Sequence, residues 1–161
     1  MDYDLTYKQA ITMLHDEANL TIASLANISS FIYYQFKNLN WVGFYLFDGQ
    51  KLVLGPFCGK VACTTINLNK GVCGKALHQN NTIVVADVHK FDGHIACDSQ
   101  SNSEIVVPIY IDDSPIGVLD IDSPIFDRFC NDDKVFFENL VNVIKNICGK
   151  NIANIFYQNK I

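Results

Sequence analysis

Three of the six cysteines stand in short segments whose neighbours could activate a thiol. Cys63, Cys73 and Cys97 lie in the segments VACT, GVCG and GHIACD, and those of Cys63 and Cys97 have no regular apolar pattern. A thiolate is a nucleophile and a metal ligand, whereas a thiol buried among apolar groups is inert. Cys73 also falls in the first turn of a predicted helix, where exposed amide groups stabilise a thiolate, although packing between two glycines explains it equally well. We therefore expect thiol chemistry or metal binding.

Three acidic residues are predicted to converge beside the Cys97 thiol. Asp120 and Asp122 are two apart in a predicted strand, so their side chains project from the same face. Glu104 begins the partner strand, and hairpin pairing brings it alongside them. Like charges in a partly buried site raise at least one pKa, which provides a general acid, while an ionised neighbour suits an ammonium group. The alternative is that Asp120 and Asp122 simply end the strand in solvent.

A metal site is the competing interpretation of the same segments. The residues that could ligate zinc are Cys63, Cys73, His94 and Cys97. They contain no Cys-x-x-Cys pair and their separations differ from the usual paired spacing, so we predict thiol chemistry and no metal. The remaining cysteines, Cys58, Cys130 and Cys148, are predicted to be structural.

Length, composition and charge restrict the class of protein. The chain has 161 residues, of which 49% are hydrophobic and 18% charged, and this predicts one folded domain over residues 1–161. A formal net charge of -5 lacks the excess of cations that binds nucleic acid. No apolar run reaches membrane-spanning length and the first residues do not resemble an export signal. We expect no membrane association and a cytoplasmic protein with reduced thiols.

The predicted secondary structure places these residues on an α+β fold. An N-terminal helical pair is expected at about 4–37 and a C-terminal helix from about 131 toward 156. Between them we predict two hairpins, 41–47 with 51–54 and 104–111 with 114–122, joined through a short helix at 71–79 and a buried strand at 83–85. The residues around Pro56, Gly59 and Thr64 are expected to break regular structure, and 87–103 to form a loop. The order predicts an antiparallel sheet packed against the N- and C-terminal helices.

Six motifs resemble the free methionine-(R)-sulfoxide reductase family, which has the GAF-domain fold. They are NWVGFY at 40–45, LGPF at 54–57, GVCG at 71–74, GHIACD at 93–98, SEIVVP at 103–108 and GVLDIDS at 117–123. The resemblance implies a single GAF-like domain that reduces free methionine-(R)-sulfoxide to methionine without a bound metal or organic cofactor. A GAF-type small-molecule or redox sensor without turnover is the alternative.

The resemblance also assigns roles to individual residues. Cys97 matches the nucleophile and Cys63 matches the thiol that resolves its sulfenic acid. Cys73 matches a third thiol, whose role is left open. The residues that match the substrate pocket are Trp41, Tyr45, Glu104, Asp120 and Asp122. A protonated carboxyl among the last three would act as the acid, and backbone amides or Lys60 would hold the substrate carboxylate. A thioredoxin-type reductant, supplied indirectly by NADPH, would regenerate the thiols, and dimerisation through the terminal helices is implied.

Overall fold

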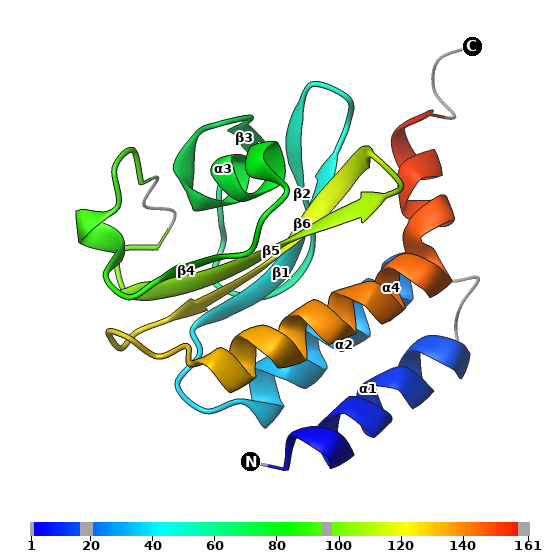
Figure 1. Ribbon diagram of the computed structural model, residues 1–161, viewed down its shortest axis with the longest axis horizontal. Helices are drawn as coiled ribbons and strands as arrows, with labels where there is room; N and C mark the ends of the chain where they lie inside the picture. The colour runs from blue at the N-terminus through cyan, green and yellow to red at the C-terminus, as the bar shows by residue number, and fades with distance from the viewer. Residues whose placement is uncertain (1, 17–20, 95–97, 158–161) are drawn as a thin grey trace.

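The computed structural model describes residues 2–16, 21–94 and 98–157, and its centre is an antiparallel sheet of six strands (Figure 1). The elements in chain order are α1 (Tyr3–Asp16), α2 (Thr21–Gln35), β1 (Trp41–Phe47), β2 (Lys51–Gly59), β3 (Thr65–Asn67), α3 (Gly71–Gln79), β4 (Ile83–Val85), the 3-10 turn η1 (Val88–Lys90), β5 (Ser103–Ile111), β6 (Ser114–Ser123) and α4 (Asn131–Tyr157). The strands lie in the order β3-β2-β1-β6-β5-β4. The predicted α+β fold with an antiparallel sheet is confirmed.

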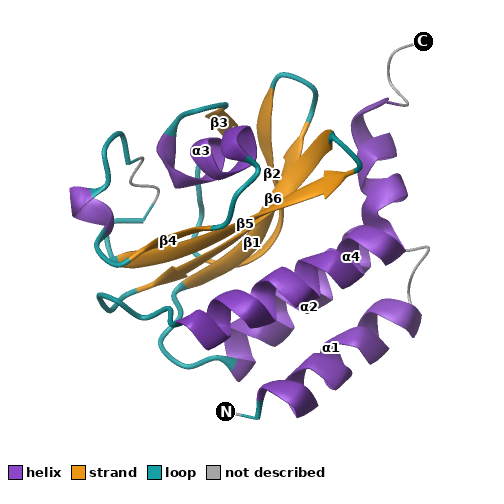
Figure 2. Ribbon diagram, viewed as in Figure 1, coloured by secondary structure: helices purple, strands orange, loops and turns teal. Residues whose placement is uncertain are grey.

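Three helices cover one face of the sheet and α3 lies on the other (Figure 2). α2 and α4 pack directly on the strands, and α1 packs against α2 and α4 on the outside. The predicted helical pair and C-terminal helix are confirmed. Of the apolar residues whose spacing predicts the pair, Leu14, Leu25 and Ile28 are buried in the core, whereas Leu5 and Ile22 are 53% and 52% exposed. Among the described helices, none has both the length and the apolar character to cross a bilayer.

The first hairpin is longer than the sequence predicts. Asp48 closes its turn by accepting hydrogen bonds from the backbone N–H groups of Gln50 and Lys51, each at 2.8 Å. β2 then continues to Gly59, paired with β1 throughout. The register of this pairing shifts between Gly43 and Tyr45. Pro56 falls in this irregular stretch, where a strand tolerates a residue without an N–H donor. The expected break at Pro56 is therefore wrong, and β3, with a single buried residue at Ile66, was not predicted.

The second hairpin matches its prediction closely. β5 and β6 are joined at residues 112–113, and Glu104 pairs with Asp122 across the ladder. Both strands are largely buried on both faces, as their apolar runs indicate. β4 pairs with β5 at the edge of the sheet, where Val84 is 40% exposed, so this strand is only partly buried.

The two faces of the sheet support two separate apolar clusters. The larger one lies under α1, α2 and α4 and includes Phe44, Leu119 and Phe137. The smaller one lies under α3 and includes Trp41, Tyr45 and Cys73. Because strand side chains alternate between faces, Trp41 and Tyr45 of β1 and Val118 of β6 all belong to the smaller cluster. This is the side on which the acidic residues project.

α3 approaches the sheet closely enough to require glycine at position 74. A Cβ on Gly74 would lie 2.4 Å from the Asn67 backbone oxygen, whereas one on Gly149 of α4 would meet the end of the Ile111 side chain at 2.9 Å. Backbone cannot move aside as a flexible side chain can. We expect Gly74→Ala to lower the free energy of unfolding by about 1–3 kcal/mol.

The matched variant Gly149→Ala should stay within about 1 kcal/mol of wild type, because alanine also favours the helix. Urea unfolding monitored by circular dichroism measures both changes. Equal stability of the two variants would contradict the proposed close approach of α3.

Candidate functional site

A single pocket gathers most of the residues singled out by the sequence. It opens on the face of the sheet that carries α3. The described residues that line it are Trp41, Tyr45, Val61, Ala62, Ile66, Gly71, Val72, Cys73, His94, Asp98, Ser101, Glu104, Asp120 and Asp122. They come from β1, β3, β5, β6, α3, the segment at 61–62 and the loop residues 94, 98 and 101. The predicted aromatic, thiol and carboxyl residues that the structure describes therefore share one site, except Cys63, which lies next to it.

The three carboxyl groups converge because of strand register. Glu104 lies opposite Asp122, and the neighbouring pair is Val106 with Asp120. Glu104 and Asp120 are only 5% and 6% exposed, and Asp122 is half-buried. The predicted convergence is confirmed, and the alternative that these acids end a strand in solvent is wrong.

Burial makes the charged forms of these carboxyl groups unfavourable. It raises the pKa of Glu104 well above its ordinary value, and the nearby charges of Asp120 and Asp122 raise it further. Burial and the charge of Asp120 raise the pKa of Asp122 in the same way. Burial raises the pKa of Asp120 to about 6. The cluster thus holds protons that exposed carboxyl groups would lose, as the sequence predicts for a general acid.

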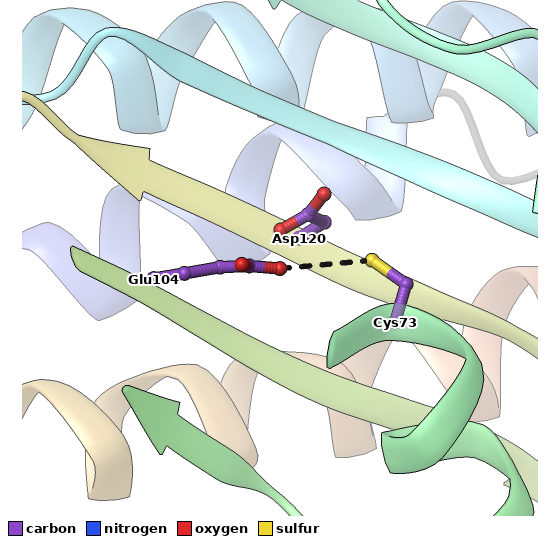
Figure 3. A group of neighbouring side chains, drawn as sticks. All are labelled: Cys73, Glu104 and Asp120. Atoms are coloured by element: carbon purple, nitrogen blue, oxygen red, sulfur yellow. Dashed lines mark hydrogen bonds between the residues drawn. The ribbon is translucent and has the colours of Figure 1, made fainter. Parts of the chain in front are cut away.

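One oxygen of this cluster has no partner among the described residues. It is Oδ1 of Asp120, a buried atom with no hydrogen bond. Figure 3 shows Asp120, Glu104 and Cys73 gathered from β6, β5 and α3. Ligand atoms of the three lie within 4.8 Å of one another. An unpaired buried acceptor is costly, so the pocket is suited to a ligand that brings a donor or a cation.

Cys73 stands in the first turn of α3, as predicted, but its thiol is not activated. The side chain is 3% exposed and its Sγ lies 4.0 Å from Glu104 Oε1. Burial raises the pKa of Cys73 well above its ordinary value, and the charges of Asp120 and Glu104 act in the same direction. The expectation that the helix N-terminus lowers this pKa is wrong, because burial against acids outweighs the helix dipole.

Trp41 and Tyr45 form the aromatic wall of the pocket. Their rings stack with centroids 5.8 Å apart, and Phe57 stacks on the other face of Trp41 at 5.4 Å. Trp41 Nε1 donates a hydrogen bond to the Lys60 backbone oxygen at 3.1 Å, and the Tyr45 hydroxyl donates one to the Cys63 backbone oxygen at 3.0 Å. The wall therefore also anchors the segment that carries Cys63.

The cysteines differ in their bonding. Cys63 is half-buried and disulfide-bonded. Of the other described cysteines, Cys58, Cys73, Cys130 and Cys148 are free. Cys148 is fully buried in the larger cluster, as predicted for a structural residue. Cys97, the predicted nucleophile, lies outside the described residues.

Two polar residues of the site had no part in the predicted catalysis: Asp98, and His94, which the sequence offered only as a possible zinc ligand. His94 Nε2 lies 3.9 Å from Glu104 Oε2, and burial lowers the pKa of His94. Asp98 accepts a hydrogen bond from Asn40 Nδ2 at 3.2 Å and pairs with the exposed amine of Lys60 at 3.7 Å. Both lie in the GHIACD motif, so this motif was the sequence feature that could have identified them as pocket residues. Arg128 pairs with Asp133 and does not line the pocket.

Comparison with known proteins identifies the family of this fold and pocket. Residues 23–147 match the model of the GAF domain. The free methionine-R-sulfoxide reductase of Escherichia coli is 51% identical over 120 residues, which cover 74% of this chain and 73% of the relative. That of Saccharomyces cerevisiae is 45% identical over 135 residues, which cover 79% and 75%.

A solved structure of fRMsr from Staphylococcus aureus in complex with substrate has a TM-score of 0.85. It is 51% identical, and the match covers 91% of this chain and 95% of that one. The free methionine-R-sulfoxide reductase of Neisseria meningitidis, solved in complex with its substrate, has a TM-score of 0.88. It is 38% identical, with coverage of 95% and 92%.

The buried Asp120 should make the protein less stable as the pH rises. The folded protein keeps the Asp120 proton up to about pH 6, whereas an unfolded chain loses it near the ordinary pKa of 3.8. The unfolded state therefore binds fewer protons in this window, and stability falls through it. We expect Asp120→Asn to raise the free energy of unfolding at pH 8 by about 1–3 kcal/mol, since one pKa unit corresponds to about 1.4 kcal/mol.

The gain should be small near pH 4, grow up to about pH 6 and then level off, as measured by urea unfolding at each pH. Asp113→Asn, at the exposed hairpin turn, is the matched control and should change little. A gain that is the same at every pH would show that burial of the charge is not its cause.

Proposed function

The chain belongs to the free methionine-(R)-sulfoxide reductases, oxidoreductases built on the GAF domain, and we propose that it reduces free methionine-(R)-sulfoxide to methionine by thiol chemistry. The observation that carries the proposal is a single pocket with buried carboxyl groups and an aromatic wall beside a disulfide-bonded cysteine. Each part of this pocket matches one part of the substrate: the ammonium group, the S-methyl group and the sulfoxide.

The acidic cluster recognises the ammonium group of a free amino acid. Asp120 Oδ1 is buried without a partner among the residues that the structure describes, and Glu104 and Asp122 lie beside it on the sheet. A bound ammonium group satisfies this acceptor and favours ionisation of its neighbours. A methionine-sulfoxide residue within a peptide lacks that charge, so the cluster selects the free amino acid.

The aromatic wall holds the other end of the substrate. Trp41 is 2% exposed and Tyr45 1% exposed, and their stacked rings offer an apolar surface to the S-methyl group. Fixing that group on one side and the ammonium on the other presents one sulfoxide epimer to the acid. The substrate carboxylate is assigned to backbone amides or to Lys60, whose amine lies at the pocket edge on Asp98.

A protonated carboxyl of the cluster activates the sulfoxide. Sulfur becomes a good electrophile when its oxygen is protonated. Burial raises the pKa values of Glu104, Asp120 and Asp122, so the cluster keeps a proton available at a higher pH than exposed carboxyl groups would. The Cys97 thiolate attacks the sulfur, an S–S bond forms, and the carboxyl proton passes to the oxygen. The hydroxyl group then transfers from the substrate sulfur to the Cys97 sulfur as the S–S bond breaks, so methionine leaves and Cys97 becomes a sulfenic acid.

Cys63 resolves the sulfenic acid. Its thiol attacks the Cys97 sulfur, the hydroxyl leaves as water, and a disulfide forms between the two residues. Two observations support this assignment: Cys63 is disulfide-bonded, and the other described cysteines are free. Cys73 stays protonated beside Glu104, which favours Cys63 over Cys73 as the resolving thiol.

An external dithiol completes the cycle. A thioredoxin-type reductant exchanges with the disulfide, releases both thiols and draws its electrons indirectly from NADPH, with no cofactor bound to this chain. Cys63 is only half-buried and its neighbour Val61 is 87% exposed, so a protein reductant can approach. Such a cycle suits the cytoplasm. Dimerisation through the terminal helices stays a prediction.

Single cysteine variants separate the two redox roles. Cys97→Ser should lower turnover by at least about 10⁴-fold and abolish sulfenic-acid labelling, because the nucleophile is gone. Cys63→Ser should still release one methionine per protein but fail to turn over with thioredoxin. Single-turnover amino-acid analysis and a sulfenic-acid probe measure both effects. Cys130→Ser, an exposed thiol, is the control, and full activity of Cys97→Ser would refute the assignment.

The choice between enzyme and sensor rests on turnover. The purified protein, thioredoxin and its NADPH-linked reductase are mixed with each sulfoxide epimer of free methionine. We expect NADPH oxidation with the R epimer and at least about 100-fold less with the S epimer. The aromatic wall contacts the S-methyl group and the acid contacts the sulfoxide oxygen, so only one arrangement of these groups around sulfur fits both. Absence of oxidation with either epimer would favour a sensor without turnover.

A further inference from the structure

We propose that the same pocket is a binding site for a thiophilic divalent cation of the Zn²⁺ class, held by Cys73, Glu104 and Asp120. The cation would occupy the place of the substrate ammonium group and so block the site reversibly. Competition with substrate rests on the function proposed above, whereas binding of the cation does not.

The donor set is the first reason. Cys73 comes from α3, Glu104 from β5 and Asp120 from β6, and one ligand atom of each lies within 4.8 Å of the others. The three are drawn together in Figure 3. One sulfur and two carboxylate oxygens are ligands that Zn²⁺ accepts, and a contraction of the cluster brings them to bonding distance. His94 Nε2, 3.9 Å from Glu104 Oε2, offers a nitrogen at the edge of the same group.

The unpartnered oxygen is an independent reason. Asp120 is 6% exposed, lines the pocket and keeps Oδ1 without a hydrogen bond in the described part of the chain. Among the described residues that line the pocket there is no lysine or arginine. A buried acceptor without a donor or a cation is unfavourable, and a divalent ion satisfies it together with both neighbours.

The chemistry of the ligands gives the test its pH dependence. A thiolate and two carboxylates bind the cation in their deprotonated forms, so binding releases protons and strengthens as the pH rises. The substrate ammonium group needs the same carboxylate oxygens, so cation and substrate exclude each other.

Cobalt is the most direct probe, because a thiolate ligand gives Co²⁺ an intense near-ultraviolet charge-transfer band. The full-length protein is used with Cys63 in its disulfide, so that Cys73 is the described free thiol in the pocket. Co²⁺ alone is titrated at pH 6 and pH 8. We expect one equivalent to produce the band, binding at least about tenfold tighter at pH 8, and bleaching by Zn²⁺, which binds such ligands more tightly.

Three variants test the ligands. Cys73→Ser should lose the band, and Asp120→Asn should weaken binding by at least about tenfold. Cys58→Ser, a half-buried free thiol on β2 outside the pocket lining, is the matched control and should keep the band. Persistence of the band in Cys73→Ser, or its absence in the wild type, overturns the site.

The last arm adds free methionine-(R)-sulfoxide to the Co²⁺ form, and we expect the band to disappear as substrate rises. A band that survives saturating substrate overturns the competition. Because turnover is measured separately without added metal, a protein that reduces the sulfoxide but shows no band refutes the cation site alone. A protein that shows the band but no turnover refutes the reductase function alone.

Discussion

The burial of Glu104, Asp120 and Asp122 on one face of the β5–β6 hairpin is the constraint on which the rest of the site depends. Like charges taken out of water repel and are poorly solvated, so the folded protein keeps protons on them that it would otherwise lose. This arrangement stabilises nothing by itself. It persists because the surrounding sheet is buried on both faces and holds the pairs of the ladder in register.

The same burial organises the thiols. α3 holds Cys73 against Glu104, and burial there raises the pKa of the Cys73 thiol. Cys63 lies on a segment outside the sheet, and the Tyr45 hydroxyl holds that segment through the Cys63 backbone oxygen. The structure thus separates a buried thiol at the acid cluster from a half-exposed, disulfide-bonded cysteine.

The elements around the site keep its carboxyl groups buried. α3 reaches the sheet only because Gly74 lets its backbone meet the Asn67 oxygen, and this contact closes the pocket from one side. Trp41, stacked between Tyr45 and Phe57, closes it from another. The helices α1, α2 and α4 bury the opposite face of the sheet, so the pocket lies on the face that carries α3. Sheet, aromatic wall and helix thus contribute to one result, a pocket in which Glu104 and Asp120 are buried.

The sequence by itself determined the elements and the face on which each acid projects. Alternation places Asp120 and Asp122 on one side of a strand, and the turn at 112–113 sets Glu104 opposite Asp122, because hairpin register follows from local geometry. Local pattern could not foresee β3 or the passage of β2 through Pro56, since both depend on pairing with a neighbouring strand. The protonation of Cys73 was also hidden from the sequence. Helix position alone predicts a lowered pKa, and only the packing of α3 against two buried carboxyl groups reverses its direction.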